Sequence, residues 1–536
     1  MPADAKTRRS LIKGLLSGAG LALTGSRIGD VLAQCVTPAV VTSDKLRPHV
    51  PGGVMSGDVT ATSGIVWSRA DRPSRMIVEY STSENFATFQ RRIGPAVLES
   101  SDFTGRVDLT SLPPGADVFY RVRFQDLVDG KAFSEPVTGR LRTASIDANK
   151  PITFVFSDDE AGQGWGINER FGGYRIYEAM RRESPDFFIH SGDQIYADSV
   201  IEFEVKLPDG TMWHNIVTEG KSHVAQTLDD YRAAFAYNQL DTAKRRFAAD
   251  VPFLVQWDDH EVRNNWYPGE QIGAAEKRYQ TRAVSLLAAR AKQAMFEYNP
   301  FRINQLDPEQ IYRAFQFGPL LDVFMLDERS YRGPNSTNLQ TRLDADSAFL
   351  GSQQTEWLKA SLKQSRATWK VIASDMPISL VVPDANPDVP KGTFEAWANA
   401  DNGAPLGREL EVKEILGFIK REDIKNVVWV TADVHYAQAT YYDPTRAKFS
   451  DFKPFWEFVG GPINAGTFGP NDLDTTFGPD LRYVSVPKDN PQNRSPAALQ
   501  QYYGRAKIDP QSRTMIVSLH DLNGKSLYEV KLDPEA

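Results

Sequence analysis

The sequence predicts a protein of the α/β class, in which a small N-terminal β-sandwich precedes a larger, layered α/β domain. Its 536 residues exceed what one hydrophobic core usually organises, so two or more domains are expected. Short alternating runs separated by turn signals fill residues 40–143, whereas strand and helix patterns alternate after residue 150. The apolar fraction of 41% and the charged fraction of 24% are those of an ordinary globular protein.

The first 34 residues have the features of an export signal in the expected order. The pair Arg8 and Arg9 resembles the twin-arginine motif, a mild apolar stretch follows at 15–24, and Ala33 ends a small-residue site suited to cleavage. We therefore expect residues 1–34 to be a twin-arginine signal peptide, with the twin-arginine translocase as a partner during export. The mature protein would be periplasmic or secreted. The alternative is a basic, frayed N-terminus of a cytosolic protein.

Composition excludes several other classes of protein. The single cysteine, Cys35, permits neither a disulfide within the chain nor a cysteine zinc site. Whether Cys35 is lipidated stays open, because Gln34 suits a lipoprotein signal poorly. No apolar run of about 18 residues occurs, so no transmembrane segment is predicted. The net charge of −8 predicts no specific nucleic-acid partner.

Residues 40–143 are predicted to form a fibronectin-like or immunoglobulin-like β-sandwich. A turn rich in proline at 112–115, followed by Tyr120 and Arg121, is typical of the fibronectin pattern. Nothing catalytic stands out in this part, so we expect a structural spacer. The predicted strands are 63–69, 75–81, 105–109, 118–125 and 137–142.

A layered α/β domain is predicted for residues 150–533, after a linker at 144–150. Residues 201–228 and 380–408 are polar and rich in glycine and proline, so we expect loops or lids over a site there. The predicted strands are 152–156, 187–190, 253–257, 320–326, 369–373, 427–431 and 515–522. The predicted helices are 170–182, 277–298, 352–365 and 409–420.

Carboxylates or histidine directly follow five of these strands, at the sheet edge where α/β proteins bind their ligands. The residues at the strand ends are Asp158 and Asp159, Asp193, Asp258 to Glu261, Asp375, and Asp433 with His435. A single such aspartate is commonly a cap or turn residue, but five are hard to explain in that way. Because gathered carboxylates repel one another unless cations neutralise them, the pattern predicts a metal centre.

The order of these motifs resembles that of the calcineurin-like metallophosphoesterases, and most fully that of the alkaline phosphatase D (PhoD-like) family. The matching segments are IVWSR at 65–69, IHSGDQIY at 189–196, WDDHEVRNNW at 257–266, DERSYR at 327–332 and DVH at 433–435. The resemblance implies a two-sheet metallophosphoesterase sandwich flanked by helices, after the family's N-terminal β-sandwich. It also implies a metal-dependent hydrolase of phosphoric esters.

By the same resemblance, a first metal, Fe3+, would be bound by Asp193, Tyr196 and His435. Asp193 would bridge to a second metal, since a carboxylate has two oxygens to share. Asp158 falls where the family usually has a cysteine ligand, and a carboxylate is a suitable hard ligand for iron. Because this position departs from the family pattern, the identity of the first metal stays open.

The resemblance surrounds the second metal with Asp193, Asp259, Asp375 and Asp433. Every protein ligand in this set offers oxygen, the donor that calcium, magnesium and manganese prefer. We therefore predict Ca2+ at the second position. An amide from Asn264 or Asn265 would complete the shell or hold the phosphate, and the choice between the two stays open.

The implied reaction is an in-line attack on phosphorus by a metal-bridged hydroxide, whose pKa the two cations lower. His260 would protonate the leaving alkoxide or hold a phosphate oxygen. Arg263 or Arg332 would clamp the phosphate, although structural ion pairs are the favoured interpretation for both. The remaining candidates are expected to be structural: His190, Asp258, His520, and the aromatic pair 502–503.

The substrate class leaves alternatives open. A small phosphate monoester and a phosphodiester both suit an alkaline phosphatase or phosphodiesterase of this kind, and a phospholipase D-like phosphodiesterase is the nearest alternative. A non-catalytic cell-wall or carbohydrate-binding protein is the alternative from another class. Loss of several metal ligands would be its signature, whereas one motif departs here.

Overall fold

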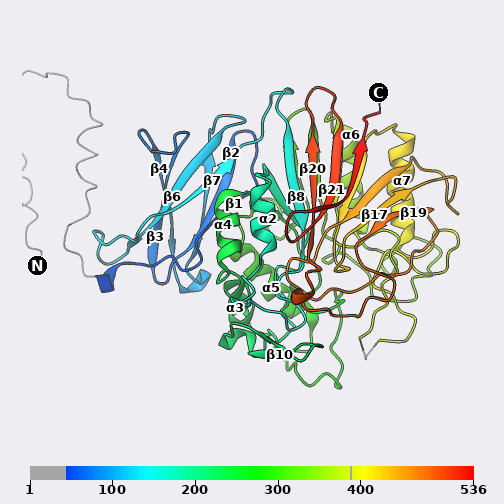
Figure 1. The fold of residues 1–536 in the computed structure, drawn as a ribbon, viewed down its shortest axis with the longest axis horizontal. Helices are drawn as coiled ribbons and strands as arrows, with labels where there is room; N and C mark the ends of the chain where they lie inside the picture. Colours follow the sequence, from blue (N-terminus) through cyan, green and yellow to red (C-terminus); the bar gives the residue numbers. More distant parts are fainter. Residues whose placement is uncertain (1–43, 387–388, 536) are drawn as a thin grey trace, which may run out of the picture.

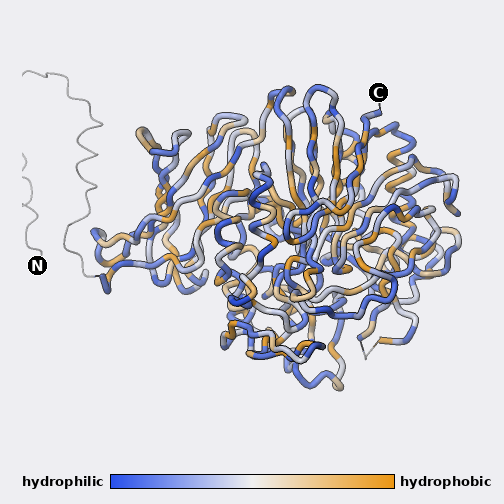
Figure 2. Tube along the Cα trace, viewed as in Figure 1, coloured by the Kyte–Doolittle hydropathy of each residue, from blue (hydrophilic) through white to orange (hydrophobic). Residues whose placement is uncertain are grey.

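The computed structural model describes residues 44–386 and 389–535. The predicted signal peptide at 1–34 and Cys35 lie outside the described residues. Within the described ranges, no helix combines the length and the apolar character that crossing a membrane requires. Apolar residues recur along the strands and helices, while the outer turns and loops are mostly hydrophilic (Figure 2).

The N-terminal part is a β-sandwich, as predicted (Figure 1). One sheet has the strand order β4-β3-β6-β7, and the facing strands are β1, β2 and β5. Side chains from both, including Val66, Met76 and Tyr120, are fully buried in a shared apolar core. The strands are β1 (Val54–Gly57), β2 (Ser63–Arg69), β3 (Ser74–Ser81), β4 (Gln90–Val97), β5 (Thr104–Thr110), β6 (Asp117–Asp126) and β7 (Val137–Arg142).

The sandwich is joined to the next domain through one continuous sheet. β1 runs parallel to β12, with Gly57 opposite Phe253, so nine strands follow the order β22-β21-β20-β8-β9-β12-β1-β2-β5. A Cβ at Gly57 would lie 2.5 Å from the carbonyl oxygen of Phe253, so only glycine permits this approach. The division into 40–143 and 150–533 stays a prediction, because hydrogen bonds of the sheet cross it.

Parallel strands β8, β9 and β12 form the centre of this sheet. Their alternate residues face two cores, as period-2 geometry requires: Phe154 and Phe187 point to the inner core, whereas Val155 and Phe188 point outward. The three parallel strands are β8 (Ile152–Ser157), β9 (Phe187–His190) and β12 (Phe253–Val255). The sheet also contains β20 (Tyr502–Ile508), β21 (Met515–Asp521) and β22 (Ser526–Leu532).

A second large sheet has seven strands in the order β13-β14-β15-β16-β18-β17-β19. β14, β15, β16 and β18 are parallel, so their carboxyl ends meet at one edge. The strands are β13 (Arg313–Phe317), β14 (Leu321–Met325), β15 (Trp369–Ala373), β16 (Val427–Thr431), β17 (Gln438–Tyr442), β18 (Phe455–Val459) and β19 (Pro479–Val484).

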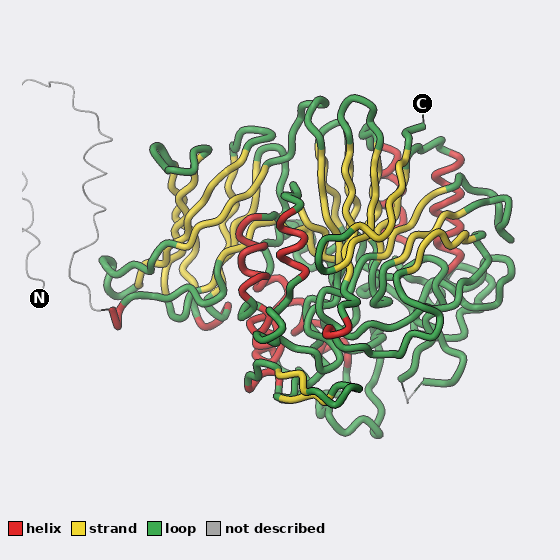
Figure 3. The backbone as a smooth tube through the Cα atoms, viewed as in Figure 1, coloured by secondary structure: helices red, strands yellow, loops and turns green. Residues whose placement is uncertain are grey.

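The two large sheets enclose an apolar core, and helices cover their outer faces (Figure 3). The first four helices belong to the core outside the nine-stranded sheet, and the last two to the core outside the seven-stranded sheet. This arrangement confirms the predicted fold class. The helices are α2 (Ile176–Arg182), α3 (Leu228–Asn238), α4 (Thr242–Asp250), α5 (Val284–Tyr298), α6 (Gly351–Gln364) and α7 (Glu409–Arg421).

Two predicted helices begin later than their sequence pattern indicates. The helix predicted at 277–298 begins at Val284, because residues 282–284 hydrogen-bond to the backbone of Glu270 and Ile272 instead. The helix predicted at 170–182 begins at Ile176. The sequence also failed to indicate α3 and α4, and 201–228 contains a small hairpin of β10 (Glu204–Lys206) and β11 (Met212–His214) rather than only loop.

Candidate metal centre

The candidate site lies where the carboxyl ends of both sheets' parallel strands converge, among the long loops below the sheets in the view of Figure 3. β8, β9 and β12 contribute from one sheet, and β15 and β16 from the other. A cavity of about 410 Å³ opens here. The predicted loop 380–408 lines part of it, through Val382, Pro383, Ala385 and Glu395.

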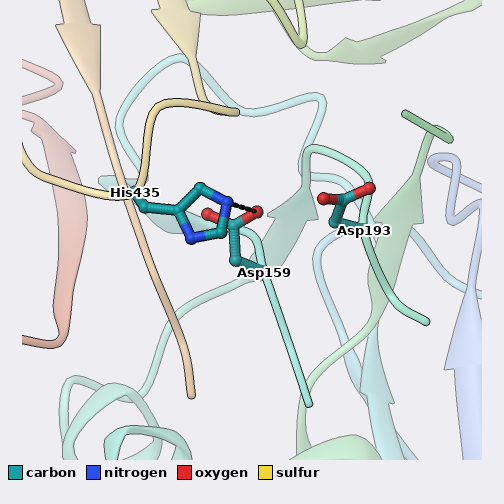
Figure 4. Close-up of side chains that lie close together, drawn as sticks. All are labelled: Asp159, Asp193 and His435. Atoms are coloured by element: carbon teal, nitrogen blue, oxygen red, sulfur yellow. Dashed lines mark ion pairs between the residues drawn. The ribbon is translucent and has the colours of Figure 1, made fainter. Parts of the chain in front are cut away.

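Four side chains converge at one end of the site. The Tyr196 hydroxyl donates to Asp159 Oδ1 at 2.9 Å and lies 3.1 Å from His435 Nε2. His435 Nε2 is 3.6 Å from Asp159 Oδ1, and the carboxylate of Asp193 is close enough to share a cation with both (Figure 4). These residues come from the ends of β8, β9 and β16, so three strands build a group of metal-ligand type.

The structure brings Asp159, rather than Asp158, to this group. Asp158 Oδ2 accepts the backbone N–H of Asp433 at 2.8 Å. Its other oxygen packs against Gly461, where an added Cβ would lie 1.7 Å away. Asp158 Oδ1 is also buried and accepts no hydrogen bond, so Asp158 stays a predicted ligand beside Asp159. β8 continues through Ser157, and the turn that follows gives Asp159 a φ of +60°, which aims its carboxylate at Tyr196.

A second group of ligand atoms adjoins the first and shares Asp193 with it. Asp193 lies with Asp259 and His260, and Asp259 lies in turn with Asp258 and Asp433. Asp193 Oδ1 accepts the N–H of His260 at 3.0 Å, which fixes its orientation. Asp193 is thus shared by two groups of candidate ligand atoms.

Several site residues adopt left-handed backbone conformations. Asp159, Asp193, Asn265, Asp433 and His435 have φ values of +60°, +51°, +59°, +68° and +62°. Such conformations cost about 1–3 kcal/mol each and persist where the surroundings fix them. Asp, Asn and His tolerate them better than most residues, so the chain turns sharply after each strand and aims these side chains at one point.

The electrostatics of the carboxylates call for cations. Burial, and then the charge of Asp259, raise the pKa of Asp193 well above its ordinary value. Asp159 Oδ2 and Asp259 Oδ1 are buried and accept no hydrogen bond. Buried carboxylate oxygens without donors are costly unless a cation binds them, so the donor set fits a centre of metal ions.

His435 is prepared as a neutral ligand. Its Nδ1 donates to the carbonyl oxygen of Gly466 at 2.7 Å, which leaves Nε2 as the lone-pair nitrogen facing Tyr196. Burial, followed by the charge on His260, lowers the pKa of His435 to about 3. The imidazole is therefore uncharged at neutral pH, as metal ligation requires.

His260 is positively charged, unlike His435. The cause is Asp198, a residue that the sequence analysis did not single out. Asp198 Oδ1 lies 2.7 Å from His260 Nδ1, and Asp198 Oδ2 accepts the N–H of Asn264 at 2.9 Å. Burial opposes the charge, but Asp198 and Asp259 outweigh it and raise the pKa of His260 to about 10. Asp198 lies five residues after Asp193 in the sequence, and this closeness to a predicted metal ligand could have identified it.

The geometry distinguishes the two adjacent asparagines. Asn265 Nδ2 donates to Asp384 Oδ1 at 3.1 Å, so its amide oxygen points away from that carboxylate. The N–H of Asn265 donates to Asp259 Oδ2, and Asn335 Nδ2 donates to the carbonyl of Asn265 at 2.7 Å. Both asparagines line the cavity, but these contacts fix Asn265 against a site carboxylate.

Three predicted residues have other partners. Asp375 pairs with Arg329, whose Nε donates to Asp375 Oδ2 at 3.2 Å, and it belongs to neither group of clustered ligand atoms. Arg263 pairs with Glu270, and Arg332 donates to the carbonyl oxygen of Glu395. Neither arginine is among the described residues that line the cavity.

The residues expected to be structural are engaged in the core. His190 Nε2 lies 3.2 Å from Glu160 Oε1, and Lys244 Nζ donates to the same carboxylate at 2.8 and 2.7 Å. His520 contacts Ser518 Oγ at 2.8 Å, and Tyr503 stacks on its ring. Asp258 is different, because it both pairs with Arg329 and belongs to the second group of ligand atoms.

Comparison with known proteins agrees with this geometry. A family model described as PhoD-like phosphatase matches residues 154–519, and one described as PhoD-like phosphatase, N-terminal domain, matches residues 34–145. Alkaline phosphatase D of Bacillus subtilis (strain 168) is 29% identical over 494 residues, which cover 86% of this chain and 77% of that protein.

Solved structures support the fold. A structure of PhoD has a TM-score of 0.67 and 22% identity, covering 92% of this chain and 94% of that chain. Purple acid phosphatase PPD1 from yellow lupin (Lupinus luteus) seeds has a TM-score of 0.55 and 10% identity, covering 91% of this chain and 74% of that chain. Because the first family model spans more than half of the sequence, this protein belongs to the PhoD-like phosphatase family of phosphoesterases.

Proposed function

We propose that this protein hydrolyses phosphoric esters at a centre of two metal cations. The observation that carries the proposal is the pair of adjoining ligand groups that share Asp193. Asp159, Asp193, Tyr196 and His435 would hold the first cation, and Asp193, Asp259, Asp433 and the amide of Asn265 the second. The non-catalytic alternative required the loss of several ligands, whereas adjoining groups of candidate ligands are present here.

Bound cations at these positions supply a nucleophile, by lowering the pKa of water, and neutralise charge on the phosphoryl oxygens. The protein's own residues do the rest. Asp193 joins the two ligand groups, and the backbone N–H of Asn265 holds the carboxylate of Asp259. His260, held as an imidazolium by Asp198, faces the cavity, where it donates a proton to the leaving alkoxide.

The cavity favours a phosphodiester as substrate. Among the described residues that line it, none is lysine or arginine. A monoester dianion would rely on the metals and His260 alone, whereas a diester carries one charge fewer. Phe468, Val382 and Pro383 provide an apolar wall for the second substituent. A phosphodiesterase, including one of the phospholipase D-like kind, is therefore favoured over a strict phosphatase for monoesters.

The test compares an aryl phosphate diester with the corresponding monoester, using the mature protein. Each substrate is assayed with a chelator, without it, and after calcium is restored. We expect diester turnover that chelation abolishes and calcium restores. A monoester preference with the same metal response would overturn the diester proposal, and no turnover in protein shown to contain metals would overturn the catalytic one.

A matched pair of variants locates the chemistry. Asp193→Asn removes the shared carboxylate and should lower diester turnover by at least about 100-fold. Asp509→Asn is the control, because Asp509 lies in the exposed turn after β20, next to the first residue of β8 and thus at the opposite end of the sheet. Near-normal turnover of Asp193→Asn would refute the shared-ligand arrangement.

We further propose Fe3+ at the first position and Ca2+ at the second. The proposal for iron is supported by the Tyr196 hydroxyl, which lies between Asp159 and His435, since phenolate, imidazole and carboxylate suit a ferric ion. The proposal for calcium is supported by the oxygen donors of the second group. Elemental analysis tests both, and a visible absorption band that Tyr196→Phe abolishes would report the iron–phenolate bond.

Export by the twin-arginine route is a separate proposal, supported by the order of charge, apolar stretch and small-residue site in residues 1–34. Replacing Arg8 and Arg9 together by lysine should retain the protein, with its signal uncleaved, in the cytoplasm of a bacterial host. Normal cleavage and release of that variant would contradict the proposal.

A further inference from the structure

A buried carboxylate from the loop 380–408 lies beside one of the proposed ligands of the second cation. Asp384 is 8% exposed, and its neighbour Asn265 is 6% exposed. Asp384 Oδ1 accepts a hydrogen bond from Asn265 Nδ2 at 3.1 Å and one from the backbone N–H of Asn386 at 3.0 Å. The other oxygen, Oδ2, accepts one from Asn335 Nδ2 at 2.9 Å. All three donors are neutral N–H groups.

Two buried arginines fix the orientation of Asn335. Arg408 Nη2 and Arg332 Nη2 both donate to Asn335 Oδ1, at 2.9 and 3.1 Å. A guanidinium has donors only, so the amide oxygen of Asn335 must face the arginines and its NH2 group must face the other way. The two hydrogens of that NH2 group have separate acceptors, which are Asp384 Oδ2 at 2.9 Å and the carbonyl oxygen of Asn265 at 2.7 Å.

The same reasoning fixes the amide of Asn265. An ionised carboxylate only accepts hydrogen bonds, so Asp384 requires Asn265 to turn its NH2 group toward it. The backbone of Asn265 is held as well, because its N–H donates to Asp259 and its carbonyl oxygen accepts from Asn335. Asn265 lines the cavity, and no hydrogen bond between described residues uses its amide oxygen. That oxygen is therefore the group of Asn265 that is left for a ligand.

We propose that Asp384 is a positioning residue for Asn265, whose amide it orients so that the oxygen, rather than the NH2 group, faces the second cation. Only the oxygen of an amide binds a metal ion, since the NH2 group is a donor. Turning this amide by half a rotation would replace a ligand by two N–H donors. The inference rests on the proposed function, in which the amide of Asn265 holds the second cation. It also gives Arg332 and Arg408 an indirect part, because they fix Asn335 and thereby Asp384.

The calcium affinity of the protein tests the orientation. Asp384→Asn keeps the size of the side chain but has one acceptor oxygen, for which Asn265 and Asn335 then compete. Calcium is removed with EGTA, and the protein is titrated with calcium chloride in a calorimeter. We expect the affinity to fall about 10- to 100-fold, as when other groups that hold a metal ligand are lost. Asp401→Asn is the control and should bind calcium normally, because Asp401 is exposed in the same loop and accepts only a local N–H, from Gly403.

Exchanging the carboxylate and the amide separates orientation from charge. In the double variant Asp384→Asn with Asn335→Asp, residue 335 still accepts from Arg332 and Arg408 and now also accepts from the NH2 group of residue 384. The oxygen of residue 384 can then accept from Asn265 again, and the total charge is that of the unaltered protein. The double variant should therefore bind calcium more tightly than Asp384→Asn. Asn335→Asp alone should bind calcium no more tightly than the unaltered protein, although it has one more negative charge.

Three results would overturn the inference. They are an unchanged calcium affinity in Asp384→Asn, a double variant that binds no more tightly than Asp384→Asn, and Asn335→Asp as the tightest binder, which charge alone would produce. If Asp384→Asn does not fold, the double variant is compared with the unaltered protein: an affinity within about 10-fold supports the inference, and a larger loss overturns it. Failure of the proposed function is distinguishable, because the unaltered protein would bind no calcium or Asn265→Ala would bind it normally, and the inference would fall with it.

Discussion

Replacing Asp198 by asparagine separates the role of His260 from that of the metal ligands. Asp198 gives one oxygen to His260 Nδ1 at 2.7 Å and the other to the N–H of Asn264 at 2.9 Å. An asparagine has one acceptor oxygen, so one of these two donors loses its partner. Because the carboxylate also stabilises the imidazolium, the variant loses both the orientation and the charge of His260.

The size of the effect follows from the contact. A buried hydrogen bond to a charged group contributes about 1.5–3 kcal/mol, which corresponds to a change in rate of about 10- to 200-fold. The full loss should appear only when the leaving group needs a proton. We therefore expect kcat to fall by this factor for a phenyl diester, and by less than about threefold for a p-nitrophenyl diester, whose leaving group departs as an anion.

The assay is a series of aryl diesters with leaving groups of decreasing acidity. A plot of log kcat against leaving-group acidity should be steeper for Asp198→Asn than for the unaltered protein. His260→Gln should give the same slope, and the double variant should be no worse than either single one, because the two residues act as a unit. Parallel lines, with equal loss on every ester, would refute the role of His260 as proton donor.

Three further predictions concern the surroundings of the site. Lys244→Met should lower the free energy of unfolding by about 3–5 kcal/mol, because it leaves the buried Glu160 carboxylate without its ammonium partner; an unchanged midpoint in urea would contradict this. Glu457, whose pKa burial raises to about 7, favours its protonated form in the folded state. Its contribution to stability is present below pH 4.5 and is lost as the pH rises to 7, by up to about 3 kcal/mol, so Glu457→Gln should flatten stability against pH in this window. Gly192→Ala should abolish activity and weaken metal binding at least about 10-fold, since φ is +107° and a Cβ would lie 2.4 Å from Asp258 Cβ; a fully active, metal-replete variant would refute the packing.

The layered fold was largely predictable from local patterns. Period-2 and period-3.6 hydrophobic runs indicated strands such as β9, β15 and β16 with correct ends, because their side chains face apolar cores on both sides. Elements whose ends depend on distant partners were predicted less well. α5 begins seven residues after its predicted start, because backbone groups near Glu270 hydrogen-bond to residues 282–284.

The candidate site was predictable as chemistry but not as a set of contacts. Carboxylates and histidine after successive strands indicated cations, and the family's motifs indicated which strands would meet. The choice between Asp158 and Asp159 depended on where β8 ends and on a turn with positive φ, which no local pattern reports. Glu395 was not foreseen, because it comes from a loop that three buried arginines hold against the centre.

The sequence by itself therefore determined the kind of chemistry: oxygen-rich ligands, their placement after parallel strands, and an α/β scaffold that brings strand ends together. These properties are local, since they depend on residue type and spacing along the chain. Only the tertiary structure decided which carboxylates face the metal centre and which face Arg329. Asp375 and Asp433 follow neighbouring strands, yet Asp375 pairs with the guanidinium while Asp433 also joins the ligand group. That distinction depends on distances across two sheets, which no spacing along one chain encodes.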